Sequence, residues 1–290
     1  REMPQLQHLW RHDAAVSTVV FRRDGQQILS AGNDGTARIW NVASGAPGWV
    51  LRHPAPVVQA LFSPDDRHVL TVCSDGQARC WNATNGTLRF TGWPVRISDY
   101  KLPLSPTALF SPDGTLLVSV TESRVELRDP KSGNLLSPPL ELGSEVRGAS
   151  FSPDGSRMVT SEVNGRVRVW ELTENGFQPL GTYKHPYGVI AVSFSTSGRT
   201  IASMGSDAIG VLWDPQSGKQ VGEHFQHDNT QLTTEAHFSP VDDRLITLSF
   251  DNTVRVWDGA TGRLLTKGIA HPNGITVARW DPAGRRIVTA

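Results

Sequence analysis

Residues 12–45 read HDAAVSTVVFRRDGQQILSAGNDGTARIWNVASG, and this stretch contains the unit from which the whole chain is built. Three short runs of apolar and β-branched residues are separated by Gly, Asp and Asn, which is typical of successive antiparallel hairpins. Four side chains stand at fixed distances from the closing tryptophan, namely His12, Ser30, Asp34 and Trp40 itself. One unit is therefore predicted to form one small, twisted sheet.

The same unit recurs along the chain in steps of 41 to 48 residues. Each copy is marked by an aromatic anchor that precedes a turn such as SPDG. These anchors are Phe21, Phe62, Phe110, Phe151, Phe194, Phe238 and Trp280. A tryptophan followed by an acid or an amide comes 19 residues after five of the anchors, whereas copy three has Arg128-Asp129 instead. A regular period of this length predicts a repeat architecture.

The period, the Trp-Asp-like dipeptide, the FSPDG turn and the preceding histidine together resemble the WD40-repeat family, and the resemblance covers essentially all 290 residues. It implies an all-β fold in one domain, residues 1–290, that is a seven-bladed β-propeller of four-stranded antiparallel blades. In this scheme the N-terminal strand completes the last blade, which lacks its third strand in this chain. Because an unpaired edge strand is an aggregation hazard, we expect the natural chain to continue past Ala290 and to be part of a longer protein.

The bulk composition narrows the function classes. The chain carries 28 basic and 28 acidic residues, so no net field favours nucleic acid or anionic lipid. Its apolar runs are too short to span a membrane. The two cysteines, Cys73 and Cys80, flank one tight turn, and a disulfide between them stays open at this point. So few cysteines predict a cytoplasmic location.

A histidine, an aspartate and a hydroxyl in register suggest a hydrolase triad, but four near-complete sets argue against a single catalytic site. The family resemblance implies a structural role, in which the hydroxyl bonds the indole N–H, the imidazole bonds the hydroxyl and the aspartate holds the imidazole. Indole only donates, so a buried tryptophan needs such an acceptor. The sets are His12, Ser30, Asp34 and Trp40; His53, Thr71, Asp75 and Trp81; His185, Ser203, Asp207 and Trp213; and His227, Thr247, Asp251 and Trp257, with His227 two residues early.

Copies three and four depart from this pattern. Copy three lacks the histidine and the tryptophan and has Glu122 near the acidic position. Copy four has Leu142 and Asn164 where the histidine and the aspartate are expected. Two neighbouring blades are therefore predicted to be less well tied.

No metal, cofactor or nucleotide site is predicted. Five histidines fall at one position of five different repeats, too far apart in a ring to share an ion, and the other four show no ligand spacing. The Gly-rich turns lack the Gly-Lys-Ser/Thr ending of a phosphate-binding loop. Arginines stand two residues before four tryptophans, and with zero net charge we interpret them as strand-surface residues and not as a nucleic-acid stripe. These arginines are Arg38, Arg79, Arg168 and Arg255.

Binding is expected on the loop face, which in this family carries the loops that enter each blade and the turns between its second and third strands. The longest linker, TGWPVRISDYKLPLSP at residues 91–106, lies there. Aromatic and arginine side chains dominate binding hot spots. The candidate partner-binding residues are Trp93, Arg96, Tyr100 and Lys101, with Tyr187 and Phe250 as second choices. The alternative for Trp93 is that it packs over the third blade.

These features predict a non-catalytic protein–protein interaction scaffold that binds a protein or peptide on its loop face. The FSPDG-rich repeats also resemble bacterial WD40 arrays that are joined to signalling enzymes. The alternative function is therefore a sensory or regulatory domain of a larger bacterial enzyme such as a Ser/Thr kinase. An enzyme in its own right would need one blade with acids and bases converging on the axis, and no copy shows this.

Overall fold

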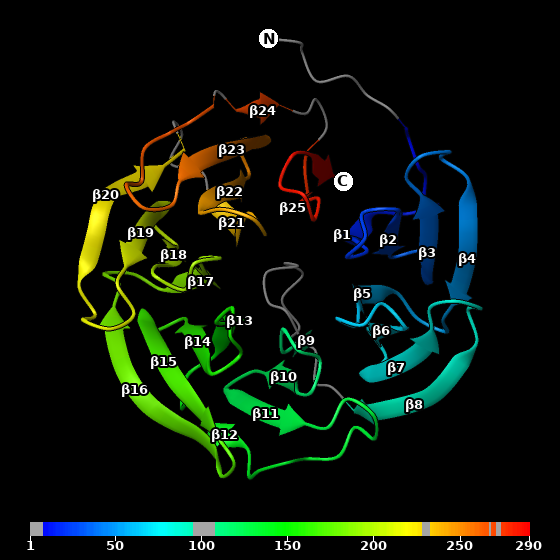
Figure 1. Cartoon of the computed structure of the whole chain (residues 1–290), viewed down its shortest axis with the longest axis horizontal. Helices are drawn as coiled ribbons and strands as arrows, with labels where there is room; N and C mark the ends of the chain where they lie inside the picture. Colours follow the sequence, from blue (N-terminus) through cyan, green and yellow to red (C-terminus); the bar gives the residue numbers. More distant parts are fainter. Residues whose placement is uncertain (1–7, 95–107, 228–232, 267, 271–273) are drawn as a thin grey trace.

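The chain forms a ring of small antiparallel sheets (Figure 1), and the computed structural model describes residues 8–94, 108–227, 233–266, 268–270 and 274–290, apart from the side chains of residues 90–94 and 234. Six sheets within these ranges have four strands each, and they are numbered blades 1–6 in chain order. The prediction of an all-β propeller with four-stranded antiparallel blades is confirmed.

The strands follow one another around the ring. Blades 1–3 consist of β1 (Val16–Phe21), β2 (Gln27–Gly32), β3 (Thr36–Asn41) and β4 (Pro47–Arg52); β5 (Val57–Phe62), β6 (His68–Cys73), β7 (Gln77–Asn82) and β8 (Leu88–Pro94); and β9 (Ala108–Phe110), β10 (Leu117–Thr121), β11 (Arg124–Arg128) and β12 (Leu140–Glu141). Blades 4–6 consist of β13 (Val146–Phe151), β14 (Arg157–Glu162), β15 (Arg166–Thr173) and β16 (Gly176–Lys184); β17 (Val189–Phe194), β18 (Ile201–Gly205), β19 (Ile209–Trp213) and β20 (Gln220–Gln226); and β21 (Thr233–Phe238), β22 (Arg244–Ser249), β23 (Thr253–Asp258) and β24 (Ile269–Ala270).

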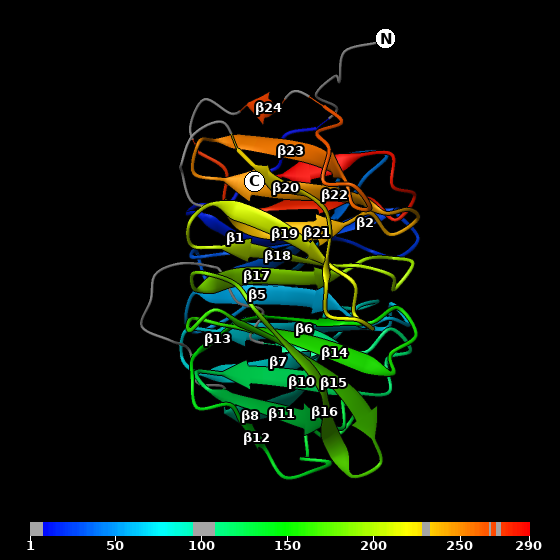
Figure 2. The same ribbon diagram turned by 90° about the vertical axis from the view of Figure 1, so that its left-hand side faces the viewer.

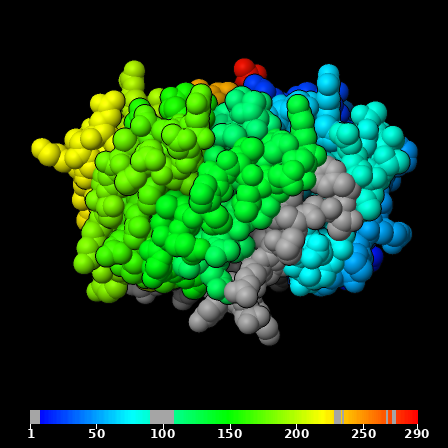
Figure 3. Space-filling view, turned by 90° about the horizontal axis from the view of Figure 1, so that it is seen from below, coloured from blue at the N-terminus to red at the C-terminus, as the bar shows by residue number. Residues whose placement is uncertain are grey.

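The first strand of each blade lies toward the centre of the ring and the last toward its rim (Figure 1), and the strands run across the thickness of the ring (Figure 2). Because neighbouring strands are antiparallel, two turns of each blade reach each face. The loop face carries the turns between second and third strands. The opposite face carries the turns that follow the aromatic anchors, and it is called the anchor-turn face below. Seen edge-on, blades 3 and 4 form a continuous outer wall (Figure 3).

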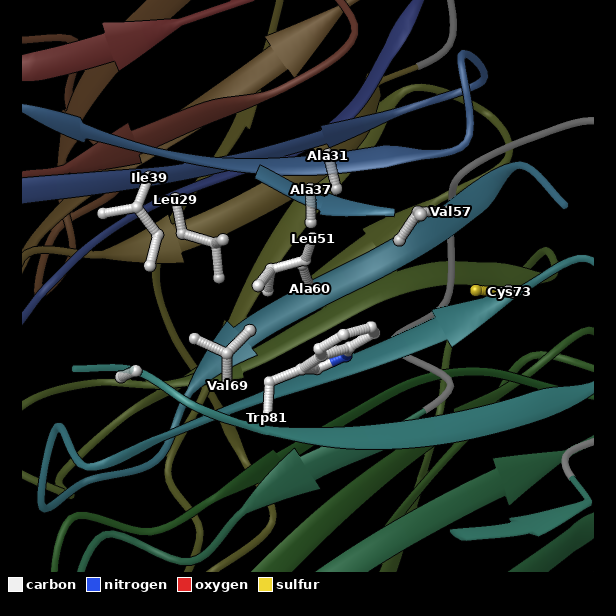
Figure 4. Packing of buried hydrophobic residues seen from close by; sticks show 11 residues of the cluster. Leu29, Ala31, Ala37, Ile39, Leu51, Val57, Ala60, Val69, Cys73 and Trp81 are labelled. Atoms are coloured by element: carbon white, nitrogen blue, oxygen red, sulfur yellow. The ribbon is translucent and has the colours of Figure 1, made fainter. Parts of the chain in front are cut away.

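The core lies between the blades. In β2, β6, β14 and β22 the last five residues are all buried, because both faces of these second strands are covered by neighbouring blades. Seven hydrophobic clusters within the described residues each join two consecutive sheets of the ring. Between blades 1 and 2, for example, Leu29 and Ile39 pack with Val69 and Trp81 (Figure 4).

The prediction of seven blades, with the last completed by the N-terminal strand, is wrong, because the described residues form six four-stranded blades. The seventh repeat forms the two-stranded sheet of β25 (Ala278–Trp280) and β26 (Ile287–Thr289). This sheet still closes the ring, since Val277 packs against Val19 and Trp40 and the Thr276 hydroxyl donates to the Val16 carbonyl at 3.0 Å. A fourth strand cannot pair without a third, and no strand is formed by residues 8–15.

Residues 8–12 nevertheless lie where an outer strand of a seventh blade would lie. The Trp10 indole donates to the Gly45 carbonyl at 3.1 Å, and its ring centroid is 6.1 Å from that of Trp40. Tyr183 in the outer strand of blade 4 makes the same kind of contact with blade 5, where its ring stacks on Trp213 at 5.6 Å. The N-terminal segment therefore packs on blade 1 as each outer strand packs on the blade that follows it.

Candidate functional site

Blade 1 contains a continuous hydrogen-bonded network. The Trp40 indole on β3 donates to the Ser30 hydroxyl on β2 at 2.8 Å, and that hydroxyl lies 2.7 Å from His12 Nε2. The other ring nitrogen, His12 Nδ1, is 2.9 Å from Asp34 Oδ2. With the imidazole neutral and its proton on Nδ1, each donor in this chain has an acceptor, so the buried tryptophan is fully satisfied.

The surroundings of this network hold it in one charge state. Burial lowers the pKa of the His12 imidazole, although Asp34 opposes this shift. Burial alone would raise the pKa of Asp34, but hydrogen bonds from the Thr36 hydroxyl and from the Asp13 and Thr36 amides lower the pKa of this carboxyl to about 2. Near neutral pH the aspartate is therefore ionised and the histidine is neutral.

Blade 6 contains the same network, although its histidine comes two residues early in the sequence. The Trp257 indole donates to Thr247 Oγ1 at 2.7 Å, and His227 lies 2.8 Å from that oxygen through Nε2 and 3.0 Å from Asp251 Oδ2 through Nδ1. The His227 side chain is fully buried. The early position of His227 in the sequence therefore does not displace its imidazole.

We expect Asp251→Ala to lower the free energy of unfolding by about 1–3 kcal/mol, because it leaves the buried His227 Nδ1–H without its carboxylate acceptor. Thermal and urea unfolding of the variant and of the unaltered chain would measure this loss. Glu223→Ala is the control, since Glu223 is exposed on β20. Equal stability of the Asp251 variant and the Glu223 variant would contradict a structural role for the network.

Blades 2 and 5 hold incomplete networks. In blade 2, Trp81 donates to Thr71 at 2.8 Å and His53 Nε2 is 2.9 Å from the same oxygen, but Asp75 instead accepts from Arg79 at 2.6 Å. His53 Nδ1 is buried and has no hydrogen-bond partner among the described residues.

In blade 5, Trp213 donates to Ser203 at 2.7 Å. His185 is 1% exposed, and neither of its ring nitrogens is hydrogen-bonded within the described part of the chain. Asp207 accepts from the Ile209 amide at 3.2 Å and so caps the turn between the second and third strands. The four side chains of this set thus share one region of the blade without forming one network.

Blades 3 and 4 replace the histidine and aspartate with ion pairs that sequence reasoning missed. In blade 3, Arg128 Nη2 donates to Glu126 Oε2 at 2.6 Å and Arg128 Nε donates to Ser119 Oγ at 3.2 Å. The arginine thereby takes the donor role of the missing tryptophan. The signal was present in the sequence, because residues 126 and 128 lie on the same side of a strand.

In blade 4, Trp170 still donates to Thr160 at 3.0 Å, and beside it Arg168 Nε lies 2.7 Å from Glu162 Oε1. The Glu162 side chain is fully buried. In blade 5 the equivalent position is Gly205, where even a Cβ atom would lie 2.5 Å from His185 Cε1. Blade 4 has no histidine there, and its glutamate uses that space. The prediction that these two blades are poorly tied therefore overlooked the ion pairs.

Arg38, Arg79 and Arg168, which each precede a tryptophan by two residues, are paired within their own blades. Arg38 donates to Asp34 at 3.1 Å, Arg79 donates to Asp75 and Arg168 contacts Glu162. Their charge is thus balanced locally, which favours the strand-surface interpretation over a nucleic-acid stripe.

Two of the predicted partner-binding residues are exposed to solvent on the loop face. Tyr187 is 59% exposed and Phe250 is 47% exposed. Val163, whose turn the sequence also places on the loop face although the residue was not among the binding candidates, is 40% exposed, and its carbonyl lies beside Gly188. Trp93 lies in β8, but its side chain is outside the described residues, as are Arg96, Tyr100 and Lys101 entirely.

The remaining predictions concern the two cysteines, metal binding and membrane-spanning segments. Both cysteines are buried free thiols, and burial raises the pKa of Cys73 to about 11. Within the described ranges no group of three or more His, Cys, Asp or Glu side chains is placed to hold a metal ion. The same ranges contain no helix long and apolar enough to cross a membrane.

Comparison with known proteins gives one family. The model of the WD domain, G-beta repeat matches residues 3–41, 45–82, 140–171 and 218–258, together just over half of the chain. The chain is 31% identical over 164 residues to Protein HIR1 of Phaeosphaeria nodorum, a match covering 50% of this chain and 15% of that protein. It is 23% identical over 176 residues to Protein HIR1 of Eremothecium gossypii, covering 50% and 21% of the two chains.

A third relative is a chromatin assembly factor 1 subunit of Mus musculus, 30% identical over 161 residues that cover 46% of this chain and 28% of the mouse protein. The matched region is thus less than a third of the length of each of these relatives. They come from two fungi and a mouse, so they give no support to the bacterial signalling alternative.

Proposed function

Because this chain belongs to the WD40-repeat family, we propose that it is a non-catalytic scaffold, built as one propeller domain, whose loop face binds a partner protein or peptide. The observation that carries this proposal is the exposure of Tyr187, Val163 and Phe250 on one face of a closed ring. Isolated exposed apolar residues are ordinary, but Val163 and Tyr187 come from turns of blades 4 and 5 that touch one another. Aromatic side chains on rigid turns lose little entropy on binding.

The polar networks indicate that the repeated histidine, hydroxyl and tryptophan residues stabilise the fold. Repeated histidine, hydroxyl and tryptophan groups bond one another inside the blades, so they are committed to packing. Among the described loop-face residues, Tyr187 and Phe250 take no part in these networks. We therefore assign binding to Tyr187 and Phe250, together with Trp93, Arg96, Tyr100 and Lys101, and assign stability to the networks.

The likeness to a subunit of chromatin assembly factor 1 favours one class of partner, namely proteins of chromatin assembly. This candidate would require a nuclear protein and not the cytoplasmic one that the cysteine content predicts. Imaging of the tagged protein together with affinity purification would separate the two possibilities.

We expect the double substitution Tyr187→Ala and Phe250→Ala to weaken partner binding by at least about tenfold, because truncating a hot-spot aromatic typically costs about 2 kcal/mol. Affinity purification with quantitative mass spectrometry identifies the partner, and titration with the purified partner measures its affinity. The matched control is Val241→Ala, which removes an equally exposed side chain (55%) from the anchor-turn face. Equal loss in both variants, or no loss in the loop-face variant, would contradict the proposal.

A further inference from the structure

Blades 4 and 5, which are neighbours in the ring (Figure 1), enclose a cavity of about 480 Å³ on the anchor-turn face. Its charged lining consists of Asp154 and Arg157 from blade 4 and Arg199 and Asp214 from blade 5, and Phe194 is among its other lining residues. None of these residues belongs to the polar networks or to the loop face. The cavity is therefore separate from both the polar networks and the loop face.

The repeats provide an internal comparison for Arg157, which stands six residues after its anchor. Arg244 holds the same position in blade 6, where its Nε atom donates to Asp242 at 2.9 Å and its Nη2 atom donates to the Gly284 carbonyl of the next repeat at 2.6 Å. Arg244 also lies over the Trp280 ring at 4.9 Å. The arginine thereby bridges blade 6 to the sheet that follows.

Arg286 holds the same position in the seventh repeat. It donates to Asp281 at 2.9 Å and lies over the Phe21 ring of blade 1 at 5.8 Å. At two of the three repeats with an arginine here, the guanidinium group is thus paired with a carboxylate of its own turn and packed against the next blade.

Arg157 has neither carboxylate. The position of Asp242 is Gly155 in blade 4, and the position of Asp281 is Ser152. Within the described residues the Arg157 guanidinium makes no hydrogen bond or ion pair, and neither does that of Arg199, which lines the same cavity. Two cationic groups from two blades thus line one hollow while their hydrogen-bond donors remain unused.

The two aspartates restrict what can bind there. Asp154 Oδ1 accepts from the Ser152 hydroxyl at 2.6 Å and from the Ser156 amide, and Asp214 Oδ1 accepts from the Gln216 amide at 2.7 Å. These hydrogen bonds lower the pKa of both carboxyls, so both are ionised near neutral pH. The cavity therefore has two positive and two negative groups, and a doubly charged phosphate would meet repulsion as well as attraction.

We propose that this cavity binds a mixed-charge peptide segment of a protein partner, in which an acidic side chain bridges Arg157 and Arg199 and a neighbouring basic side chain meets Asp154 or Asp214. Guanidinium groups bind carboxylates through paired, charge-assisted hydrogen bonds. The site lies on the face opposite Tyr187 and Phe250, so it is independent of the proposed loop-face function. One ring could then hold two partners at once.

Fluorescence polarisation of the labelled peptide Gly-Ser-Glu-Lys-Glu-Lys-Ser-Gly at low salt tests this proposal on the whole chain. We expect saturable binding that weakens about tenfold or more in Arg157→Met and in Arg199→Met. Arg67→Met is the matched control, because Arg67 holds the repeat position of Arg199 on the same face but lies outside the cavity. Thermal unfolding of each variant separates loss of binding from loss of fold.

Two further peptides, one with glutamine in place of both lysines and one with phosphoserine in place of both glutamates, test the choice of ligand. Both should bind more weakly than the mixed-charge peptide. Tighter binding of either one, absence of saturable binding to the unaltered chain, or equal weakening in Arg67→Met would overturn the proposal. The Tyr187 and Phe250 variant should bind this peptide normally, so failure of one site does not imply failure of the other.

Discussion

Replacing Glu162 by alanine is expected to lower the free energy of unfolding by about 3 kcal/mol or more, because it leaves the Arg168 guanidinium without its carboxylate. The Glu162 side chain is fully buried and the Arg168 side chain is 19% exposed, so water compensates the lost ion pair only in part. Within the described residues, the other hydrogen-bond acceptor of the Arg168 side chain is the Leu142 carbonyl at 3.3 Å. Urea unfolding monitored by tryptophan fluorescence would measure the loss.

A double substitution shows whether Glu162→Ala loses stability because a charge is left unpaired or because a cavity is left in the core. Glu162→Leu combined with Arg168→Leu should recover most of the stability that Glu162→Ala loses, since apolar residues of similar size often replace buried ion pairs without cost. The exposed pair of Arg124 and Glu141 serves as the control, with side chains 49% and 57% exposed. Glu141→Ala should cost less than about 1 kcal/mol. A loss for Glu162→Ala as small as that of Glu141→Ala would refute a strong ion pair in blade 4.

The sequence predicted the repeat architecture well because the fold depends on short-range signals that recur. The anchors Phe21, Phe62, Phe151, Phe194 and Phe238 each end a first strand, as the spacing indicated. The continuous apolar runs that follow them become second strands buried on both faces. Even the early histidine of copy six, His227, reaches Asp251 and Thr247.

The sequence did not reveal that some repeats replace the hydrogen-bonding residues of the network with other polar residues while the blade packs in the same way. Searching for histidine, aspartate and tryptophan identified blades 3 and 4 as defective, whereas Arg128 and Arg168 there make ion pairs with Glu126 and Glu162. Conversely, His185 fits the spacing, but neither of its ring nitrogens is hydrogen-bonded within the described residues. Spacing tells which residues can meet, and local backbone and neighbouring side chains decide whether they do.

The spacing argument showed that the seventh repeat lacks its third strand, but it still counted this repeat as a blade completed by the N-terminal strand. Seven anchors predicted seven blades, but a blade needs a third strand to carry its fourth. The seventh repeat supplies β25 and β26 at the inner side of the ring, and there Thr276 and Val277 contact the strand of Val16 and Val19. Ring closure therefore depends on the inner strands, which is why the six complete blades can be held in place without a complete seventh.

Acidification is expected to destabilise the propeller, in large part through His53. Burial, reinforced by the nearby Arg79, lowers the pKa of this imidazole from 6.5 to about 4. Between these two values the unfolded chain binds a proton at this residue and the folded chain does not. Stability therefore falls as the pH drops from about 6.5 to about 4 and is unaffected by this group at higher pH.

The hydrogen bonds of blade 2 explain why protonation is unfavourable. His53 Nε2 faces the Thr71 hydroxyl at 2.9 Å, and that oxygen already accepts from Trp81. A proton on Nε2 would remove the nearer of the two acceptors of the Thr71 hydroxyl, leaving the Arg79 carbonyl at 3.4 Å, and would place a charge near the Arg79 guanidinium. The contribution amounts to about 2 kcal/mol across this range, less than the full pKa difference implies because the ring is partly exposed.

His53→Gln tests this attribution, because its side-chain oxygen can still accept a hydrogen bond from Thr71 but cannot titrate. Free energies of unfolding, measured by urea from pH 7 to pH 4.5, should fall less steeply in this variant than in the unaltered chain. The difference between the two slopes should correspond to about one proton fewer taken up on unfolding. Some slope should remain, since burial also lowers the pKa of His12 and of His185. Parallel curves for the two proteins would show that His53 is charged in the folded state and that the buried network of blade 2 tolerates its proton.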